Sequence, residues 1–274
     1  MKKIILLLLA LSLLAGCKKD EDPVVATEAE KTETEDEKTE DDKTDDGNKK
    51  GGVVITFDDR AIEEWYMADS LLKNHEWKAT FCVSQIKKCT SEEIQKIHEL
   101  DNAGHEIAGH GLNHLNSVEY TSTHGIDSYL NDEIIPMLNI MENESIISNS
   151  FSYPYGARND LTDNALLDYF KIIRGTISGE KKPSDHNCYF NNSPIVFGIG
   201  IDNHYEHFSE EYVLDLLDYA KENNRILILY GHVPVVNVTT KYQTDISTLE
   251  LICDYIREND MEYYTLKDLS DKLE

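Results

Sequence analysis

The sequence has few positive charges, few cysteines and no long apolar run, and each shortage excludes a class of protein. Lysine and arginine number 26 against 52 aspartates and glutamates, so the formal net charge is −26. Such a surface repels polyanions, which excludes nucleic acid as a main partner. The 5 cysteines in 274 residues are too few for a disulfide-dense scaffold. No apolar run reaches the roughly 18 residues that a membrane-spanning helix needs.

Residues 1–16 have the pattern of an export signal. Lys2 and Lys3 form a positive end, and the apolar segment Ile4–Ala15 that follows is too short to cross a bilayer stably. The segment runs into Leu14-Ala15-Gly16-Cys17, which resembles the lipobox of bacterial lipoproteins. This resemblance implies cleavage before Cys17 and acylation of its thiol, so we expect an exported lipoprotein that is anchored to a membrane. A plain secretory signal with an incidental cysteine is the alternative.

Residues 17–50, which begin with the acylated cysteine, form a charged spacer. Positions 18–50 hold 14 acidic and 7 basic side chains and no aromatic one. This composition cannot bury enough apolar surface to offset the entropy of ordering, so we expect a disordered acidic linker. The remaining residues, 51–274, carry a net charge of −21 and are expected to form one folded domain.

From Gly51 onward, short apolar segments alternate with amphipathic ones. Strands are predicted near residues 53–57, 78–84, 105–108, 150–153, 171–175, 195–201, 226–230 and 262–265. Helices are predicted near residues 62–74, 91–103, 126–141, 162–168, 210–222 and 247–259. Strands that alternate with helices over this length predict a parallel sheet in an α/β fold. Roughly eight such units predict a closed or nearly closed, TIM-barrel-like structure.

Polar side chains follow several of these strands at their carboxyl ends, where parallel barrels carry their chemistry. They are Asp58 and Asp59 after the first strand, His110 and His114 after the third, Tyr155 after the fourth, Asp202 after the sixth and His232 after the seventh. Each element is a weak signal alone. Together they predict one cluster at the carboxyl end of the barrel.

The residue types in this cluster suit a metal-dependent hydrolase. Two histidines four positions apart, with one carboxylate, form a three-ligand site of the kind that holds catalytic zinc, which lowers the pKa of a bound water to about 7. Adjacent strand side chains diverge, so one of Asp58 and Asp59 can bind metal while the other acts as a base. His232 could protonate a leaving group. The alternatives are a helix N-cap role for the aspartates and polar loop packing for His110 and His114.

At these residues the sequence resembles the polysaccharide deacetylase family, the NodB-homology domains of carbohydrate esterase family 4, over about residues 51–270. Thr56–Asp59 matches the family's Thr-Phe-Asp-Asp motif, with Arg60 where glycine is usual. His110–His114 matches its His-x-x-x-His motif, with Gly111 where serine or threonine is usual. The resemblance implies a distorted (β/α)₇ barrel in which residues 51–274 form the catalytic domain.

The resemblance also implies a role for each residue of the cluster. Asp59, His110 and His114 would bind Zn²⁺, or another divalent metal such as Co²⁺ or Ni²⁺; Asp58 would be the general base, Tyr155 the oxyanion donor through its backbone N–H, His232 the general acid and Asp202 the carboxylate that supports this histidine. The implied reaction removes N-acetyl or O-acetyl groups from a polysaccharide or peptidoglycan outside the cytoplasm. An acetylated glycan is therefore the expected substrate.

Ser152 departs from the family pattern, because the third motif usually begins with an arginine that orients the base. Without that arginine, Asp58 is expected to lack a cationic partner and to have a raised pKa. The departures at Arg60 and Ser152 keep a second hypothesis open, a catalytically impaired glycan-binding lipoprotein of the same fold. A third hypothesis takes the two histidines and one carboxylate as a non-haem iron oxygenase site.

Overall fold

The computed structural model describes residues 50–179 and 182–273. The predicted signal peptide, residues 1–16, and all but the last residue of the predicted linker, residues 17–50, lie outside the described residues. Among the described helices, none combines the length and apolarity needed to cross a membrane.

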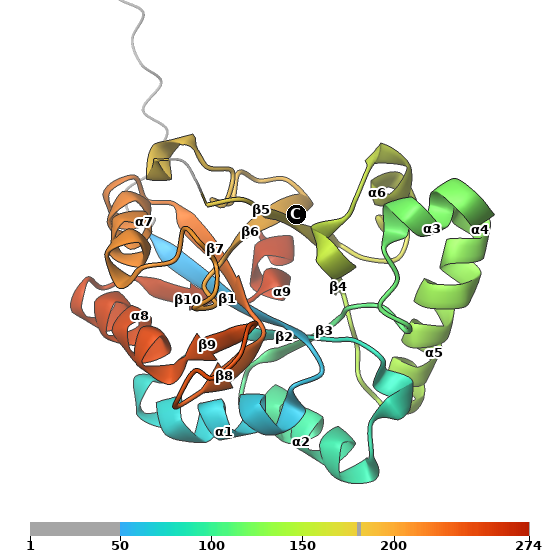
Figure 1. Cartoon of the computed structure of the whole chain (residues 1–274), viewed down its shortest axis with the longest axis horizontal. Helices are drawn as coiled ribbons and strands as arrows, with labels where there is room; N and C mark the ends of the chain where they lie inside the picture. Colours follow the sequence, from blue (N-terminus) through green and yellow to red (C-terminus); the bar gives the residue numbers. More distant parts are fainter. Residues whose placement is uncertain (1–49, 180–181, 274) are drawn as a thin grey trace, which may run out of the picture. The chain divides into compact units, whose positions relative to one another are not determined.

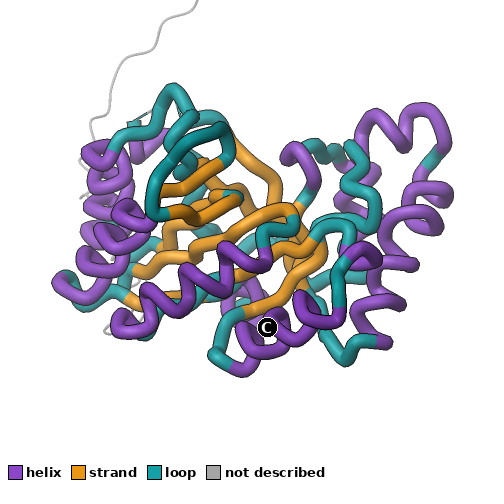
Figure 2. The backbone as a smooth tube through the Cα atoms, turned by 60° about the horizontal axis from the view of Figure 1, so that its bottom comes forward, coloured by secondary structure: helices purple, strands orange, loops and turns teal. Residues whose placement is uncertain are grey.

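Seven parallel strands close into a barrel, as the resemblance implies (Figure 2). The ring closes where β1 pairs with β7, and an eighth strand, β10, adds to the amino-terminal half of β1. The strands are β1 (Gly52–Asp59), β2 (Thr80–Val83), β3 (Glu106–Gly109), β4 (Ser150–Ser152), β5 (Ile172–Ile177), β6 (Ile195–Gly200), β7 (Ile226–Gly231) and β10 (Glu262–Tyr264). All eight predicted strands are therefore confirmed, and the last lies beside the ring rather than in it.

Helices surround the barrel, with α7 and α8 on one side of the strands and α3, α4 and α5 on the opposite side (Figure 1). The helices are α1 (Ile62–Leu72), α2 (Ser91–Asn102), α3 (Ser117–His124), α4 (Ile126–Tyr129), α5 (Ile135–Asn143), α6 (Asp160–Leu166), α7 (Glu210–Glu222), α8 (Ile246–Glu258) and α9 (Leu266–Asp271). Polar caps explain several starts; Thr90, for example, forms a capping box with Glu93 at α2. The single helix predicted at 126–141 is instead α4, a π-helical turn and α5.

The strands separate two apolar cores. On β1, Val53, Ile55 and Phe57 belong to the outer core between strands and helices, whereas Val54 belongs to the core inside the barrel. Because strand side chains alternate, Asp58 also faces the barrel interior. The base predicted from the sequence is therefore mounted on the inner face of the sheet, at the carboxyl end of its strand.

Helix α9 closes the amino-terminal end of the barrel. Leu266 and Leu269 are fully buried in the inner core. The helix start is fixed by the first residues of two strands, because Leu266 N–H donates to Thr80 Oγ1 at 3.0 Å and Lys267 N–H to Glu106 Oε2 at 2.8 Å. The carboxyl end of the barrel, where the polar cluster lies, is the end left accessible.

Candidate active site

Three side chains at the carboxyl end of the barrel form a candidate metal-binding triad. His114 Nε2 lies 3.1 Å from Asp59 Oδ1, and His110 Nε2 lies 3.6 Å from the same oxygen. In a tetrahedral zinc site with bonds of about 2.0–2.1 Å, two ligand atoms are about 3.3 Å apart. The described residues contain this one group of three or more potential metal ligands. The observed spacing therefore fits a divalent ion.

Backbone geometry and one hydrogen bond orient these ligands. His110 Nδ1–H donates to the Ser152 carbonyl at 2.8 Å, which leaves Nε2 with its lone pair for a metal. Asp59 and His114 both have left-handed backbone conformations, with φ values of 82° and 63°. Such conformations cost a non-glycine residue about 1–3 kcal/mol and cluster at functional sites. Asp59 is the last residue of β1.

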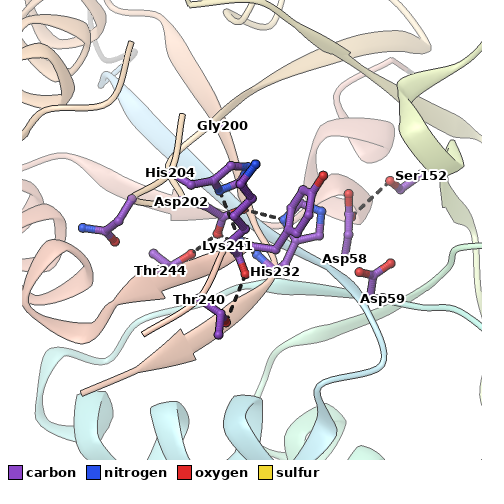
Figure 3. A network of polar contacts seen from close by, with 12 residues as sticks. Asp58, Asp59, Ser152, Gly200, Asp202, His204, His232, Thr240, Lys241 and Thr244 are labelled. Carbon is purple, nitrogen blue, oxygen red and sulfur yellow. Dashed lines mark hydrogen bonds and ion pairs between the residues drawn. The ribbon is translucent and has the colours of Figure 1, made fainter. Parts of the chain in front are cut away.

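Asp58 has a cationic partner, so the prediction that it lacks one is wrong. The Arg174 guanidinium, carried by β5 and fully buried, donates to both carboxylate oxygens of Asp58 and to Ser152 Oγ, with a distance of 2.6 Å to Oδ2. The Ser152 hydroxyl donates to Asp58 Oδ1 at 3.1 Å (Figure 3). Arg174 also lies 5.0 Å from the centroid of the Tyr230 ring, a cation–π contact.

The predicted rise in the pKa of Asp58 is also wrong. Burial alone would raise this pKa, but the positive charge of Arg174, helped by His110 and His232, outweighs burial and holds the pKa below its usual value. Asp58 is therefore ionised at neutral pH, as a general base must be. Arg60, the other departure from the family motif, pairs with Glu93 and not with Asp58. Its Nη1 donates to Glu93 Oε1 at 2.9 Å.

His232 and Asp202 form a buried pair on the other side of the cluster. The Asp202 carboxylate accepts from His232 Nδ1 at 2.5 Å, from the His232 backbone N–H at 3.1 Å and from Thr244 Oγ1 at 2.6 Å (Figure 3). A carboxylate only accepts, so Nδ1 carries the proton and Nε2 is free for substrate chemistry. Burial would lower the pKa of His232, but the hydrogen bond and charge of Asp202 raise it above its usual value.

One cavity of about 420 Å³ joins these groups. It is lined by Asp58, Asp59, His110, His114, Tyr155, Gly156, Thr176, Tyr205, Tyr230, His232 and Tyr242. The Tyr155 ring is 69% exposed and packs on His114 with ring centroids 4.7 Å apart, and the Tyr242 ring is 52% exposed and packs on His232 at 5.1 Å. Two exposed aromatic rings therefore stand at the cavity, one beside His114 and one beside His232.

Three larger hollows lie elsewhere. Two of them, of about 620 and 870 Å³, are lined in part by Glu262 and Tyr264 of β10, and the third, of about 590 Å³, is lined in part by Asp69 of α1. None of the three contains a residue of the predicted cluster. The predicted residues converge in the smaller cavity, with Asp202 directly behind His232.

Sequence reasoning missed Arg174 and Tyr242. Arg174 stands in the predicted fifth strand between Ile173 and Gly175, and an arginine in a buried strand signals a buried carboxylate partner. Tyr242 follows a polar loop and has no comparable signal.

Comparison with known proteins agrees with this geometry. The family model of the polysaccharide deacetylases matches residues 45–169, which contain both the Asp58–Asp59 pair and the two histidines. Residues 45–169 therefore match the polysaccharide deacetylase family. No curated protein matches the chain in sequence.

Solved structures of carbohydrate esterases and deacetylases share the fold of this chain at low sequence identity. The Xyl-CE4 domain of a multidomain xylanase from the hindgut metagenome of Trinervitermes trinervoides is 17% identical with a TM-score of 0.53, covering 81% of this chain and 91% of that one. The chitin deacetylase of Colletotrichum lindemuthianum is 16% identical with a TM-score of 0.53, covering 80% and 88%. A family 4 acetyl xylan esterase of Clostridium thermocellum in complex with a cobalt ion is 17% identical with a TM-score of 0.50, covering 80% and 90%.

Proposed function

We propose that this protein is a metal-dependent hydrolase that removes N-acetyl groups from a polysaccharide or from peptidoglycan outside the cytoplasm. The reaction hydrolyses a carbon–nitrogen bond other than a peptide bond, and O-acetyl esters are the alternative substrates. One observation carries the proposal: the triad of Asp59, His110 and His114 shares a single cavity with an ionised Asp58 and with His232.

Each residue has a defined task in this reaction. Asp59, His110 and His114 would hold Zn²⁺, Co²⁺ or Ni²⁺, and a bound ion of this kind lowers the pKa of water and polarises a carbonyl oxygen. Asp58 accepts the proton of the attacking water, because Arg174 keeps its carboxylate ionised and fixed in position.

The remaining steps use Tyr155, which packs beside His114, and His232 on the other side of the cavity. The backbone N–H of Tyr155 donates to the oxyanion, a contribution of about 2.7–4 kcal/mol for such a donor. His232 passes the proton on Nε2 to the departing amine nitrogen, while Asp202 holds its Nδ1–H. The pKa of Asp58 is lowered and that of His232 is raised, so base and acid hold complementary protonation states.

Acetate release tests the proposal. Chito-oligosaccharides and peptidoglycan fragments are incubated with the full chain, with and without chelator, and released acetate is measured. Asp58→Asn is expected to lower the rate by about 10²–10⁴-fold. Asp69→Asn is the matched control, because Asp69 also pairs with a histidine, His105, at 2.8 Å but lies outside the catalytic cavity. Full activity in Asp58→Asn, or in the chelated protein, would contradict the proposal.

The two alternative hypotheses have less support. Catalytic impairment was suggested by Arg60 and Ser152, but Arg60 binds Glu93 and Arg174 supplies the charge missing at position 152. Tight binding of glycan without turnover, in the presence of Zn²⁺, would favour that alternative. An iron oxygenase would leave the Asp58 and His232 arrangement without a task, and oxygen uptake on addition of Fe²⁺ would favour it.

The proposed location rests on the amino-terminal sequence alone. We expect residues 1–16 to be removed and the thiol of Cys17 to be acylated, which would tether the domain by its acidic linker to the outer face of a membrane. Cys17→Ser should move the protein from the membrane fraction to the soluble fraction without loss of acetate release. Membrane association that is unchanged in this variant would contradict the lipid anchor.

A further inference from the structure

A buried carboxylate that the proposed reaction does not use lies behind the loop that carries His114. Glu133 has an exposed fraction of 0%. Its Oε2 accepts from the backbone N–H of Asn113 at 2.8 Å and from Asn113 Nδ2 at 2.9 Å, and its Oε1 accepts from Leu115 N–H at 2.9 Å. The two backbone donors stand directly before and after His114.

The loop is shaped around this carboxylate. Gly111 has a φ of 85°, and a Cβ atom at this position would lie 2.4 Å from Glu133 Oε1. His114 itself has a φ of 63°. The strained backbone of a metal ligand is therefore fixed on both sides by one side chain, with no room for a side chain at position 111.

A break in the helix places Glu133 at this point. Leu130–Ile134 forms a π-helical turn between α4 and α5, and Pro136 follows it. Proline has no N–H, so the Asp132 carbonyl cannot receive the usual helical hydrogen bond from position 136. This carbonyl accepts from Asn113 Nδ2 at 3.0 Å instead. Both Glu133 and its helix backbone are thus directed to the loop, and π-helical turns of this kind occur frequently at functional sites.

We infer that Glu133 is a positioning residue that holds His114 in its metal-binding conformation. The inference rests on the proposed function, because it takes Asp59, His110 and His114 as metal ligands. Glu133 would act through the backbone of residues 113–115 and would touch neither metal nor substrate. Groups behind the ligands typically change metal affinity by about 10–100-fold when they are replaced.

Metal binding to Glu133→Gln tests the inference. The amide keeps the size of the side chain, but it has one acceptor oxygen where the carboxylate has two. Binding of Co²⁺ to the full chain is measured by titration, together with the visible absorption of the bound Co²⁺, which reports the ligand geometry. We expect affinity to fall by about 10–100-fold and the Co²⁺ spectrum to change.

Glu106→Gln is the matched control. Glu106 is also buried and also accepts three hydrogen bonds, from Ser150 Oγ at 2.5 Å, Thr80 Oγ1 at 2.8 Å and Lys267 N–H at 2.8 Å. It begins β3 at the amino-terminal end of the barrel, so its loss should lower stability without changing Co²⁺ affinity. Equal loss of affinity in Glu106→Gln and Glu133→Gln would overturn the inference.

A second variant keeps the test decisive if Glu133→Gln does not fold. Asn113 is exposed. Asn113→Ala removes one hydrogen bond to Glu133, the one to the Asp132 carbonyl and the one that Asn113 Oδ1 accepts from Lys87 Nζ, without touching the core. Affinity for Co²⁺ should fall by a smaller factor, and unchanged affinity in Asn113→Ala and in any folded Glu133→Gln would overturn the inference. A wild-type chain that binds no Co²⁺ would also overturn it. A wild-type chain that binds Co²⁺ tightly and loses affinity in Glu133→Gln, yet releases no acetate, would contradict the proposed function and support this inference.

Discussion

Ser152 and Arg174 are register partners on the adjacent strands β4 and β5, and the guanidinium of Arg174 reaches across Ser152 to Asp58. The positive charge that the family motif places at position 152 is therefore supplied from the next strand, in the same layer of the barrel. Ser152 is small enough to leave room for it, and its hydroxyl joins the network by donating to Asp58.

Arg174→Met should impair both catalysis and stability. The variant leaves the Asp58 carboxylate buried and unpaired, which costs about 3–5 kcal/mol of unfolding free energy. The pKa of Asp58 should rise, because burial raises it and the opposite charge that outweighs burial is gone. Since Asp58 acts in its ionised form, the acidic limb of the pH profile of kcat/KM should move to higher pH.

The double variant Ser152→Arg with Arg174→Ser is the matched control for Arg174→Met. It returns the charge to the strand where the family carries it, so acetate release and the acidic limb should recover relative to Arg174→Met. A pH profile for Arg174→Met that matches the wild type would show that Arg174 does not set the ionisation of Asp58.

Asp202→Asn should shift the alkaline limb of the pH profile to lower pH. His232 acts as an acid in its protonated form, so activity is present below its pKa and is lost as pH rises through that pKa. Burial lowers the pKa of His232 and Asp202 raises it, so removing the charge of Asp202 should lower this pKa and move the limb to lower pH. The profile of kcat against pH measures the shift. Asp245→Asn, at the half-buried N-cap of α8, is the control, and an unmoved limb in Asp202→Asn would refute the assignment of His232 as acid.

Tyr242→Ala should weaken binding of oligosaccharides while sparing the chemical step. The exposed ring at the cavity rim can stack on the face of a sugar, and aromatic stacking contributes about 0.5–1.5 kcal/mol. KM for a chito-oligosaccharide should therefore rise by about 2–10-fold with kcat nearly constant.

A small aryl acetate should be hydrolysed normally, because it does not reach the rim. Tyr169→Ala is the control, since that ring is 39% exposed and lies outside the cavity. Unchanged KM in Tyr242→Ala would exclude a role in glycan binding.

Metal removal should abolish acetate release, and Zn²⁺, Co²⁺ or Ni²⁺ should restore it. A metal ion that binds the folded state and not the unfolded state should also raise the unfolding free energy, by about 2.7 kcal/mol at a free concentration of 100 times Kd. Thermal unfolding with and without Zn²⁺ measures this effect. His114→Ala should lose most of the stabilisation, and a variant that keeps the full shift would place the metal elsewhere.

The barrel could be predicted from the sequence because its strands are apolar and regularly spaced. The prediction failed where tertiary contacts decide local structure. Helix α3 has a polar sequence and is fixed by its Asn116 cap, and the short pair β8 (Val233–Val235) and β9 (Gln243–Asp245) has only three residues in each strand. The π-helical turn lies inside a continuous helical pattern, where only Pro136 marks the interruption.

The sequence predicts most of the catalytic residues that line the cavity, but it does not predict Arg174 and Glu133. Asp59, His114 and His232 come at or after the ends of apolar strands, so their positions in the sequence place them at the carboxyl end of the barrel. Arg174 and Glu133 are buried within regular elements, and their roles depend on which loop or strand packs beside them. That packing is a property of the closed barrel, which a linear pattern of residues does not contain.

The closure of the amino-terminal end of the barrel by α9 has a consequence for the release of product. Leu266 and Leu269 fill the barrel interior at that end, so no passage through the barrel leads out of the cavity. Acetate formed at the floor of the cavity would have to leave by the route that the sugar chain occupies. On long polymers, the dissociation or sliding of the polysaccharide would then limit the turnover rate. Short fragments would be deacetylated faster per acetyl group than long ones.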